Sequence, residues 1–309
     1  MTEHRPFAAF GYALSAANLL AKSNNFRFFG VTVTELISSK YRNFLKPATL
    51  APIMRLCLLI LISFFTHTLW ACSCVTLTLI EKVSFSDFIA TAKIIKVLPD
   101  KKNLEYHDVE IQIIDIYKGK RISNLKIHSI LNSSCSFYTS ENSTWLIFAS
   151  RDKNGDLVFG DCSGLLQIDF KYDSVKYKNA QVNYDKSIRK QLQVLDFLKN
   201  NQITPKNEYF LRSYMSNICF NNFTGSEVYK EQFAIYEFTI NKDLTIKTVK
   251  AVKGFENIEC ESDLLECLKI GVKVNNNRRP NLISETRIMI ALYMYPPKNG
   301  YKSFIGAYE

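Results

Sequence analysis

The chain has 309 residues, of which 47% are hydrophobic and 22% are charged, and its formal net charge is +10. This is the composition of a globular protein, so it excludes a disordered, collagen-like or polytopic membrane chain. The length allows two domains of roughly 100–150 residues. The basic charge favours nucleic-acid binding and the eight cysteines favour disulfides, so the positions of both kinds of residue have to be considered.

An apolar segment near residue 60 has the features of a secretory signal peptide. It begins at Met54 with one positive charge, Arg55, continues through an apolar run of about ten residues, and ends in a short polar stretch before Ala71. The run is shorter than the roughly 20 residues that cross a bilayer comfortably. We therefore interpret residues 54–71 as a signal peptide. The alternative is a buried helix or a short signal anchor.

Residues 1–53 precede this segment and show no clear periodic pattern. They contain two acidic residues, Glu3 and Glu35. We expect translation to begin at Met54, so that residues 1–53 would come from an over-called start codon; a basic, acid-poor transit peptide is the alternative. Without residues 1–71 the chain has 238 residues, seven cysteines and 32 basic against 27 acidic residues. We therefore expect a net charge of +5 and an oxidising location, secreted or periplasmic, where disulfides persist.

Residues 72–200 contain several strand-like segments followed by one amphipathic segment. The strand-like segments are rich in β-branched and aromatic residues and are separated by turn signals; they are Phe88–Leu98, His107–Tyr117, Asn124–Leu131, Thr144–Ser150 and Asp156–Asp161. Asn154-Gly155 predicts a hairpin between the last two. Five such strands favour a small barrel, and Asp185–Lys199 predicts a flanking helix that ends before Pro205.

Residues 205–309 follow a predicted boundary near residue 203 and have a different order of elements. The predicted elements are two strands, a short helix and a final strand, at Phe233–Ile240, Thr245–Lys253, Ser262–Ile270 and Leu282–Tyr295. The sequence therefore predicts a mainly β protein of two domains, a barrel with a helix in 72–200 and an α+β domain of β-β-α-β order in 205–309.

Cys72-Ser73-Cys74 directly follows the predicted signal peptide, and Cys135 and Cys162 lie downstream. This arrangement resembles the N-terminal domain of the tissue inhibitors of metalloproteinases, a netrin-like OB-fold whose mature N-terminus is Cys-x-Cys. The resemblance covers about 95 residues and lacks the third disulfide and the cysteine-rich C-terminal subdomain of the animal inhibitors. Supporting matches are Asp87-Phe88-Ile89-Ala90, Tyr117-Lys118-Gly119, Trp145-Leu146-Ile147-Phe148-Ala149 and Cys162-Ser163-Gly164.

The resemblance implies an OB-fold barrel with two disulfides, Cys72–Cys135 and Cys74–Cys162. It further implies that the α-amine and carbonyl of Cys72 chelate the catalytic zinc of a partner protease while Ser73 points into its substrate pocket. An α-amine has a reference pKa of about 7.7–8.0, so a neutral nitrogen is accessible near neutral pH, and metal binding favours it further. The alternative is that the two disulfides only tie a free N-terminus to a small barrel.

Leu69-Trp70-Ala71-Cys72 is close to a lipobox, with Leu at −3 and Ala at −1. Lipidation would consume the Cys72 thiol and N-acylation would remove its α-amine, so this fate is incompatible with both the Cys72–Cys135 bond and the chelate. Six cysteines would then remain to pair, whereas seven leave one unpaired. Both fates stay open, a disulfide-bonded Cys72 or a lipidated Cys72 in an outer-membrane lipoprotein.

The second half is similar to the TonB C-terminal domain over about 80 residues, from Phe233–Ile240 to a last strand at Arg287–Tyr295. It lacks that family's Trp-x-Pro, membrane anchor and proline-rich spacer, so the resemblance implies a binding or dimerising module rather than energy transduction. Cys260 and Cys267 are expected to pair if Cys260 precedes the helix, because seven residues of helix would separate their Cα atoms by about 10.5 Å. Cys219 then has no evident partner.

The predicted mature chain has two histidines, His107 and His128, and no H-E-x-x-H motif. No metal site of its own, no cofactor and no enzymatic activity are therefore predicted. Nucleic acid is the least favoured ligand, because basic and aromatic residues are not clearly interleaved. We predict an extracytoplasmic binding protein with a protein partner, in the sharper version a zinc metalloprotease. The alternatives are a lipid-anchored envelope protein that uses residues 205–309 for protein contacts, and an OB-fold that binds oligosaccharide.

Overall fold

The computed structural model describes residues 74–100, 103, 105–130, 136–216, 220–256, 261–276 and 282–307, together with four residues near position 30. The chain divides between Trp70 and Ala71 into two units. In the first unit the described residues form a short antiparallel pair, β1 (Arg27–Phe28) with β2 (Val31–Thr32). The predicted signal peptide lies outside the described residues. The following paragraphs concern the second unit.

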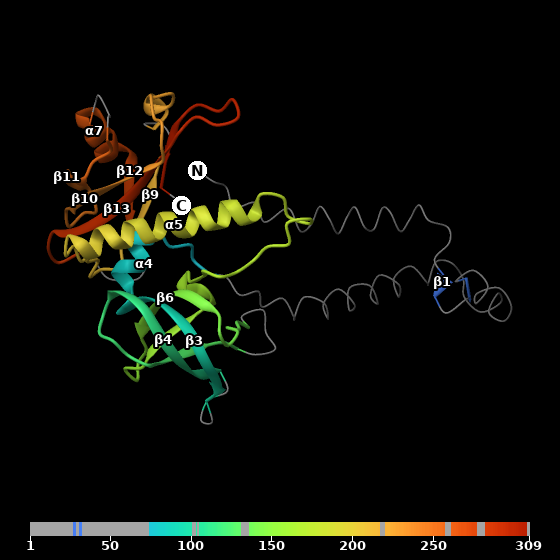
Figure 1. The fold of residues 1–309 in the computed structure, drawn as a ribbon. Coiled ribbons are helices and arrows are strands. Elements are labelled where there is room, and N and C mark those ends of the chain that lie inside the picture. Colours follow the sequence, from blue (N-terminus) through green and yellow to red (C-terminus); the bar gives the residue numbers. More distant parts are fainter. Residues whose placement is uncertain are drawn as a thin grey trace, which may run out of the picture. The chain divides into compact units, whose positions relative to one another are not determined.

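Five strands of the second unit close into a β-barrel (Figure 1). They pair in the order β3-β4-β5-β7-β6, and β6 pairs again with β3. The pair β5–β7 is parallel and the other neighbours are antiparallel. This order is consistent with an OB-like barrel, and each strand lies within a few residues of its expected bounds. The strands are β3 (Phe88–Pro99), β4 (Tyr106–Lys118), β5 (Asn124–His128), β6 (Thr144–Arg151) and β7 (Leu157–Gly160).

The first half of β3, residues 88–92, and the middle of β6, residues 145–149, are buried on both faces. Alternate residues such as Phe88 and Ile94 pack inside the barrel, whereas Ile89 of β3 and Leu146 of β6 pack outward into a second apolar cluster. This explains why these two stretches are largely apolar on both faces, as expected for a strand covered on both sides. A two-residue strand, β8 (Leu166–Gln167), pairs with β6 beyond the barrel.

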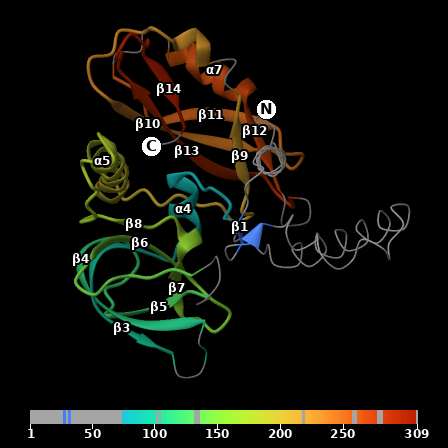
Figure 2. The same cartoon turned by 90° about the vertical axis from the view of Figure 1, so that its right-hand side faces the viewer.

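Two helices cover the outer face of β3 and β6. The short α4 (Leu79–Phe85) precedes the barrel and was not predicted. The long α5 (Ala180–Asn200) follows it and starts five residues before the predicted helix at Asp185. Figure 2 shows α4 and α5 between the barrel and a second sheet. Leu79 and Ile80 of α4 and Leu195 of α5 belong to the same buried cluster as Ile89.

The second sheet has the strand order β11-β10-β13-β14, with all neighbours antiparallel. The predicted β-β-α-β elements are present as β10 (Gln232–Ile240), β11 (Ile246–Lys253), α7 (Glu261–Gly271) and β13 (Thr286–Tyr295). Three short strands were not predicted: β9 (Arg212–Met215), which pairs with β12 (Val272–Asn275), and β14 (Phe304–Gly306). Leu264 and Leu268 of α7 are buried against this sheet.

The second sheet also contributes to the cluster that covers the barrel. Ile235 of β10 and Ala291 and Tyr293 of β13 pack there with residues of β3, β6 and α5. Ala71–Glu309 is one compact unit. The predicted division into two domains at residue 203 therefore stays a prediction.

Tyr117, near the end of β4, gives a pH-dependent test of the packing between the barrel and α5. Burial, together with the nearby carboxylates Asp196 and Asp115, raises the pKa of Tyr117 from 10.0 to about 12. The folded state therefore keeps this proton at a pH where the unfolded chain loses it, so the stabilisation is complete below pH 10 and decreases as the pH rises towards 12. Denaturant unfolding at pH 9, 10 and 11 should show a steeper decrease for the wild type than for Tyr117→Phe. The same substitution at exposed Tyr138 is the control, and equal slopes for wild type and Tyr117→Phe would contradict this prediction.

Candidate functional site

The described chain of the second unit begins with a segment that leads from the surface into the core. We call Cys74–Thr78 the N-terminal segment. Cys74, Val75 and Thr76 are exposed, Leu77 is half-buried, and Thr78 is buried. Leu79 and Ile80 follow within α4 and are both 1% exposed. The segment therefore presents its first residues to solvent while its last residue is fixed in the interior.

A disulfide fixes the outer end of the segment. Cys74 bonds to Cys162, with the two Cα atoms 5.1 Å apart, which is the pairing that the resemblance implies. Cys162 lies in a single 3-10 turn, Asp161–Ser163, directly after β7. Gly164 ends this turn with φ +70°, and a Cβ there would lie 2.5 Å from Cε of Lys82. The positive φ favours glycine there, and the turn that carries Cys162 lies beside the Lys82 side chain of α4.

A capping box fixes the inner end. The backbone N–H of Thr78 donates to Oε2 of Glu81 at 2.9 Å, and the N–H of Glu81 donates to Oγ1 of Thr78 at 3.4 Å. These reciprocal bonds satisfy two N–H groups that a helix start leaves without partners. The pattern Thr-x-x-Glu is the signal in the sequence from which α4 could have been found.

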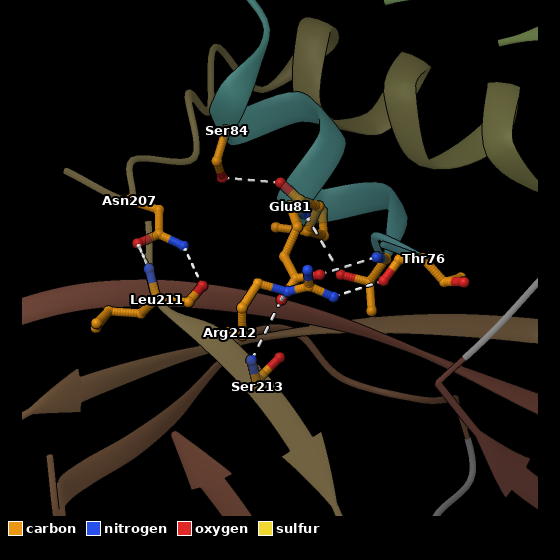
Figure 3. Close-up of polar contacts among 9 residues, drawn as sticks. Thr76, Glu81, Ser84, Asn207, Leu211, Arg212 and Ser213 are labelled. Carbon is orange, nitrogen blue, oxygen red and sulfur yellow. Dashed lines mark hydrogen bonds and ion pairs between the residues drawn. The ribbon is translucent and has the colours of Figure 1, made fainter. Parts of the chain in front are cut away.

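Glu81 also contacts the C-terminal half of the chain. Its Oε1 accepts from the backbone N–H of Ser213 and from Nε of Arg212, both at 3.2 Å, and Nη2 of Arg212 donates to the carbonyl of Thr76 at 2.5 Å (Figure 3). Glu81 is 4% exposed. A buried carboxylate needs such partners, because its desolvation is costly. The sequence offered no signal for Arg212, which comes close only through the tertiary fold.

Asn207 stabilises the loop that precedes Arg212 by two hydrogen bonds to the backbone of Leu211. Its Oδ1 accepts from the N–H of Leu211 and its Nδ2 donates to the carbonyl of Leu211, both at 2.8 Å. The ring of Phe210 in the same loop lies 4.9 Å from that of Phe85 of α4. The hydrogen bonds of Asn207 and the ring contact of Phe210 therefore stabilise the packing of the start of β9 against α4.

Most of the other predicted site residues lie outside the residues that the structure describes. Cys72, Ser73, Cys135 and Cys260 lie outside the described residues, as does Cys219. Cys267, on α7, is disulfide-bonded; its predicted pairing with Cys260 stays a prediction.

One group of candidate metal ligands is found in the described part of the chain. The ligand atoms of Cys74, Asp161 and Cys162 lie within 4.8 Å of one another. Both sulfurs belong to the disulfide, whereas metal binding by cysteine requires the thiolate. This group therefore does not offer a cysteine metal site while the disulfide is formed.

The fold defines a class: a mainly β protein with a closed five-stranded barrel. No protein-family model matches the chain, and no curated protein matches its sequence. Within the ranges that the structure describes, no helix is both long and apolar enough to cross a membrane.

Proposed function

We propose that this chain is a non-enzymatic, extracytoplasmic binding protein that presents the residues before Cys74 to a protein partner. The observation that carries the proposal is the Cys74–Cys162 disulfide, which fixes an exposed segment to a closed barrel. The Cys-x-Cys sequence after a predicted signal peptide supports the same function, as does the barrel strand order. The proposal includes neither nucleic acid nor a cofactor.

The sharper proposal is inhibition of a zinc metalloprotease. Catalytic zinc has three protein ligands and an open position for water or substrate. The α-amine and carbonyl of Cys72 would occupy that position, and Ser73 would enter the substrate pocket. Cys74 is two residues away and is fixed by its disulfide. Such restraint lowers the entropy that is lost on binding, and therefore favours affinity.

An added alanine before Cys72 tests the chelate. It moves the α-amine away from the carbonyl of Cys72, so inhibition of a zinc protease should weaken by at least about 100-fold, given that even outer contacts of metal sites contribute 10–100-fold to affinity. The measurement is the inhibition constant of the mature protein with and without the added residue. An alanine added at the C-terminus is the matched control. Equal potency of all three proteins would refute chelation.

A lipid-anchored envelope protein is the second candidate, favoured by the lipobox-like Leu69-Trp70-Ala71-Cys72 and by the odd number of cysteines after residue 71. In this case the membrane holds the chain through Cys72, and residues 205–309 make the protein contacts. Mass spectrometry of the mature N-terminus separates the two candidates. A diacylated Cys72 would exclude the inhibitor mechanism, whereas a free amine with Cys72 bonded to Cys135 would exclude the anchor.

A further inference from the structure

Arg212 belongs to β9, yet its side chain reaches the N-terminal segment 136 residues earlier in the chain. Nη2 donates to the carbonyl of Thr76 at 2.5 Å, while Nε donates to Oε1 of Glu81 at 3.2 Å (Figure 3). The Arg212 side chain is 17% exposed. One guanidinium therefore holds both the exposed part of the segment and the buried carboxylate of the helix cap.

The two bonds of Arg212 have different physical roles. The bond to Glu81 gives a buried carboxylate its cationic partner, beside the N–H groups of Thr78 and Ser213. The bond to Thr76 reaches a backbone carbonyl of the exposed segment and contributes nothing to the neutralisation of Glu81. A planar guanidinium can reach both acceptors at once, whereas a lysine ammonium is a single point charge. Lysine should therefore preserve the ion pair and lose the bond to the segment.

The place of Arg212 depends on the C-terminal half of the chain. β9 pairs with β12, with Arg212 opposite Asn275, and β12 continues directly from α7. The N–H of Ser216, just after β9, donates to the carbonyl of Gly271 at the end of α7. The N-terminal segment is thus restrained from three parts of the chain: Cys162 of the barrel, Glu81 of α4, and Arg212 of the C-terminal half.

We propose that Arg212 is a positioning residue of the N-terminal segment, so that the C-terminal half of the chain sets the orientation of Cys74–Thr78 in the presence of a partner. Its consequence for partner binding rests on the proposed function above. The ordering of Val75, Thr76 and Leu77 is a property of the chain alone and can be measured without any partner.

The test compares the full mature chain with Arg212→Lys, Arg212→Gln and the control Arg287→Gln, which removes an exposed arginine near Glu237. Backbone ¹⁵N relaxation gives the order parameters of Val75, Thr76 and Leu77. We expect values near about 0.85 in the wild type and control, and below about 0.6 in both Arg212 variants. Thermal unfolding is measured in parallel, and Arg212→Lys should unfold within a few degrees of the wild type because the ion pair with Glu81 is kept.

Unchanged order parameters in both Arg212 variants would overturn the positioning role, whatever the inhibition assay shows. Where the wild type inhibits a zinc protease, Arg212→Lys should weaken inhibition by about tenfold or more, the range for the loss of one hydrogen bond to a charged group. If the N-terminal segment of Arg212→Lys were mobile and the variant still inhibited at full potency, Arg212 would have no effect on partner binding. A wild type that inhibits no zinc protease would refute the proposed inhibition, and the order parameters would still decide the role of Arg212.

Discussion

Glu81→Ala is expected to lower the free energy of unfolding by about 3–5 kcal/mol, the usual cost of removing one partner of a buried ion pair. The substitution leaves the guanidinium of Arg212 without its carboxylate, and leaves the N–H groups of Thr78 and Ser213 without their acceptor. It also removes the side chain that closes the capping box of α4. Urea unfolding of the mature protein gives the value.

Glu285→Ala is the matched control for this variant. Glu285 pairs with Lys247, but both side chains are about half exposed, so the loss should be about 0–1 kcal/mol. The double variant Glu81→Leu with Arg212→Leu adds a sharper comparison. It removes both charges but still leaves the two N–H groups without an acceptor, so it should recover only part of the loss. A Glu81→Ala protein as stable as Glu285→Ala would show that the buried network contributes little.

Replacing Cys74 and Cys162 together by serine is expected to lower the free energy of unfolding by about 2–5 kcal/mol. The disulfide joins residues 88 positions apart, and a loop of this length restrains the unfolded chain strongly, which is why its removal favours unfolding. The loss should be accompanied by higher mobility of the N-terminal segment, because one of its three restraints disappears. Denaturant unfolding under oxidising conditions measures the first effect, and ¹⁵N relaxation measures the second.

Val175→Ser is the control for the cysteine variant, because Val175 is 94% exposed and a surface change there should stay within about 0.5 kcal/mol. Replacing both cysteines avoids a free thiol that could form a wrong disulfide. If the double variant and Val175→Ser were equally stable, the disulfide would contribute little to the free energy of unfolding. Unchanged order parameters of the N-terminal segment would show that the disulfide does not restrain the segment.

The regular elements with strong local patterns could be predicted from the sequence. The run of Ile and Val predicts the strand at Phe88–Leu98. Asn154-Gly155 predicts the hairpin that begins with Thr144–Ser150, and the hairpin between β6 and β7 confirms this prediction. In the structure Gly155 has φ +86° and Asp152 Oδ1 accepts from the N–H groups of Asn154 and Asp156. These signals are local, because side-chain alternation and turn chemistry act within a few residues.

The short elements could not be predicted in the same way. α4 has seven residues, too few for a helical period to be recognised, and only its capping box marked it. β9 and β12 have four residues each and are far apart in the chain, so neither carries a pattern of its own. Each of these two strands forms only because it pairs with the other, and this pairing is a tertiary contact.

The candidate site also has features that could be predicted from the sequence and features that could not. The sequence alone was enough to predict the five barrel strands and the β-β-α-β elements of the second half, and it contains the Cys-x-Cys pattern after an apolar segment, because these depend on residue type and short-range spacing. Only the tertiary structure shows that Arg212 and Ser213 contact Glu81 and that the first half of β3 and the middle of β6 are covered on both faces. The contacts of Glu81 join residues more than 100 positions apart, and the cover of β3 and β6 combines α4, α5 and the second sheet, so both depend on how the whole unit packs.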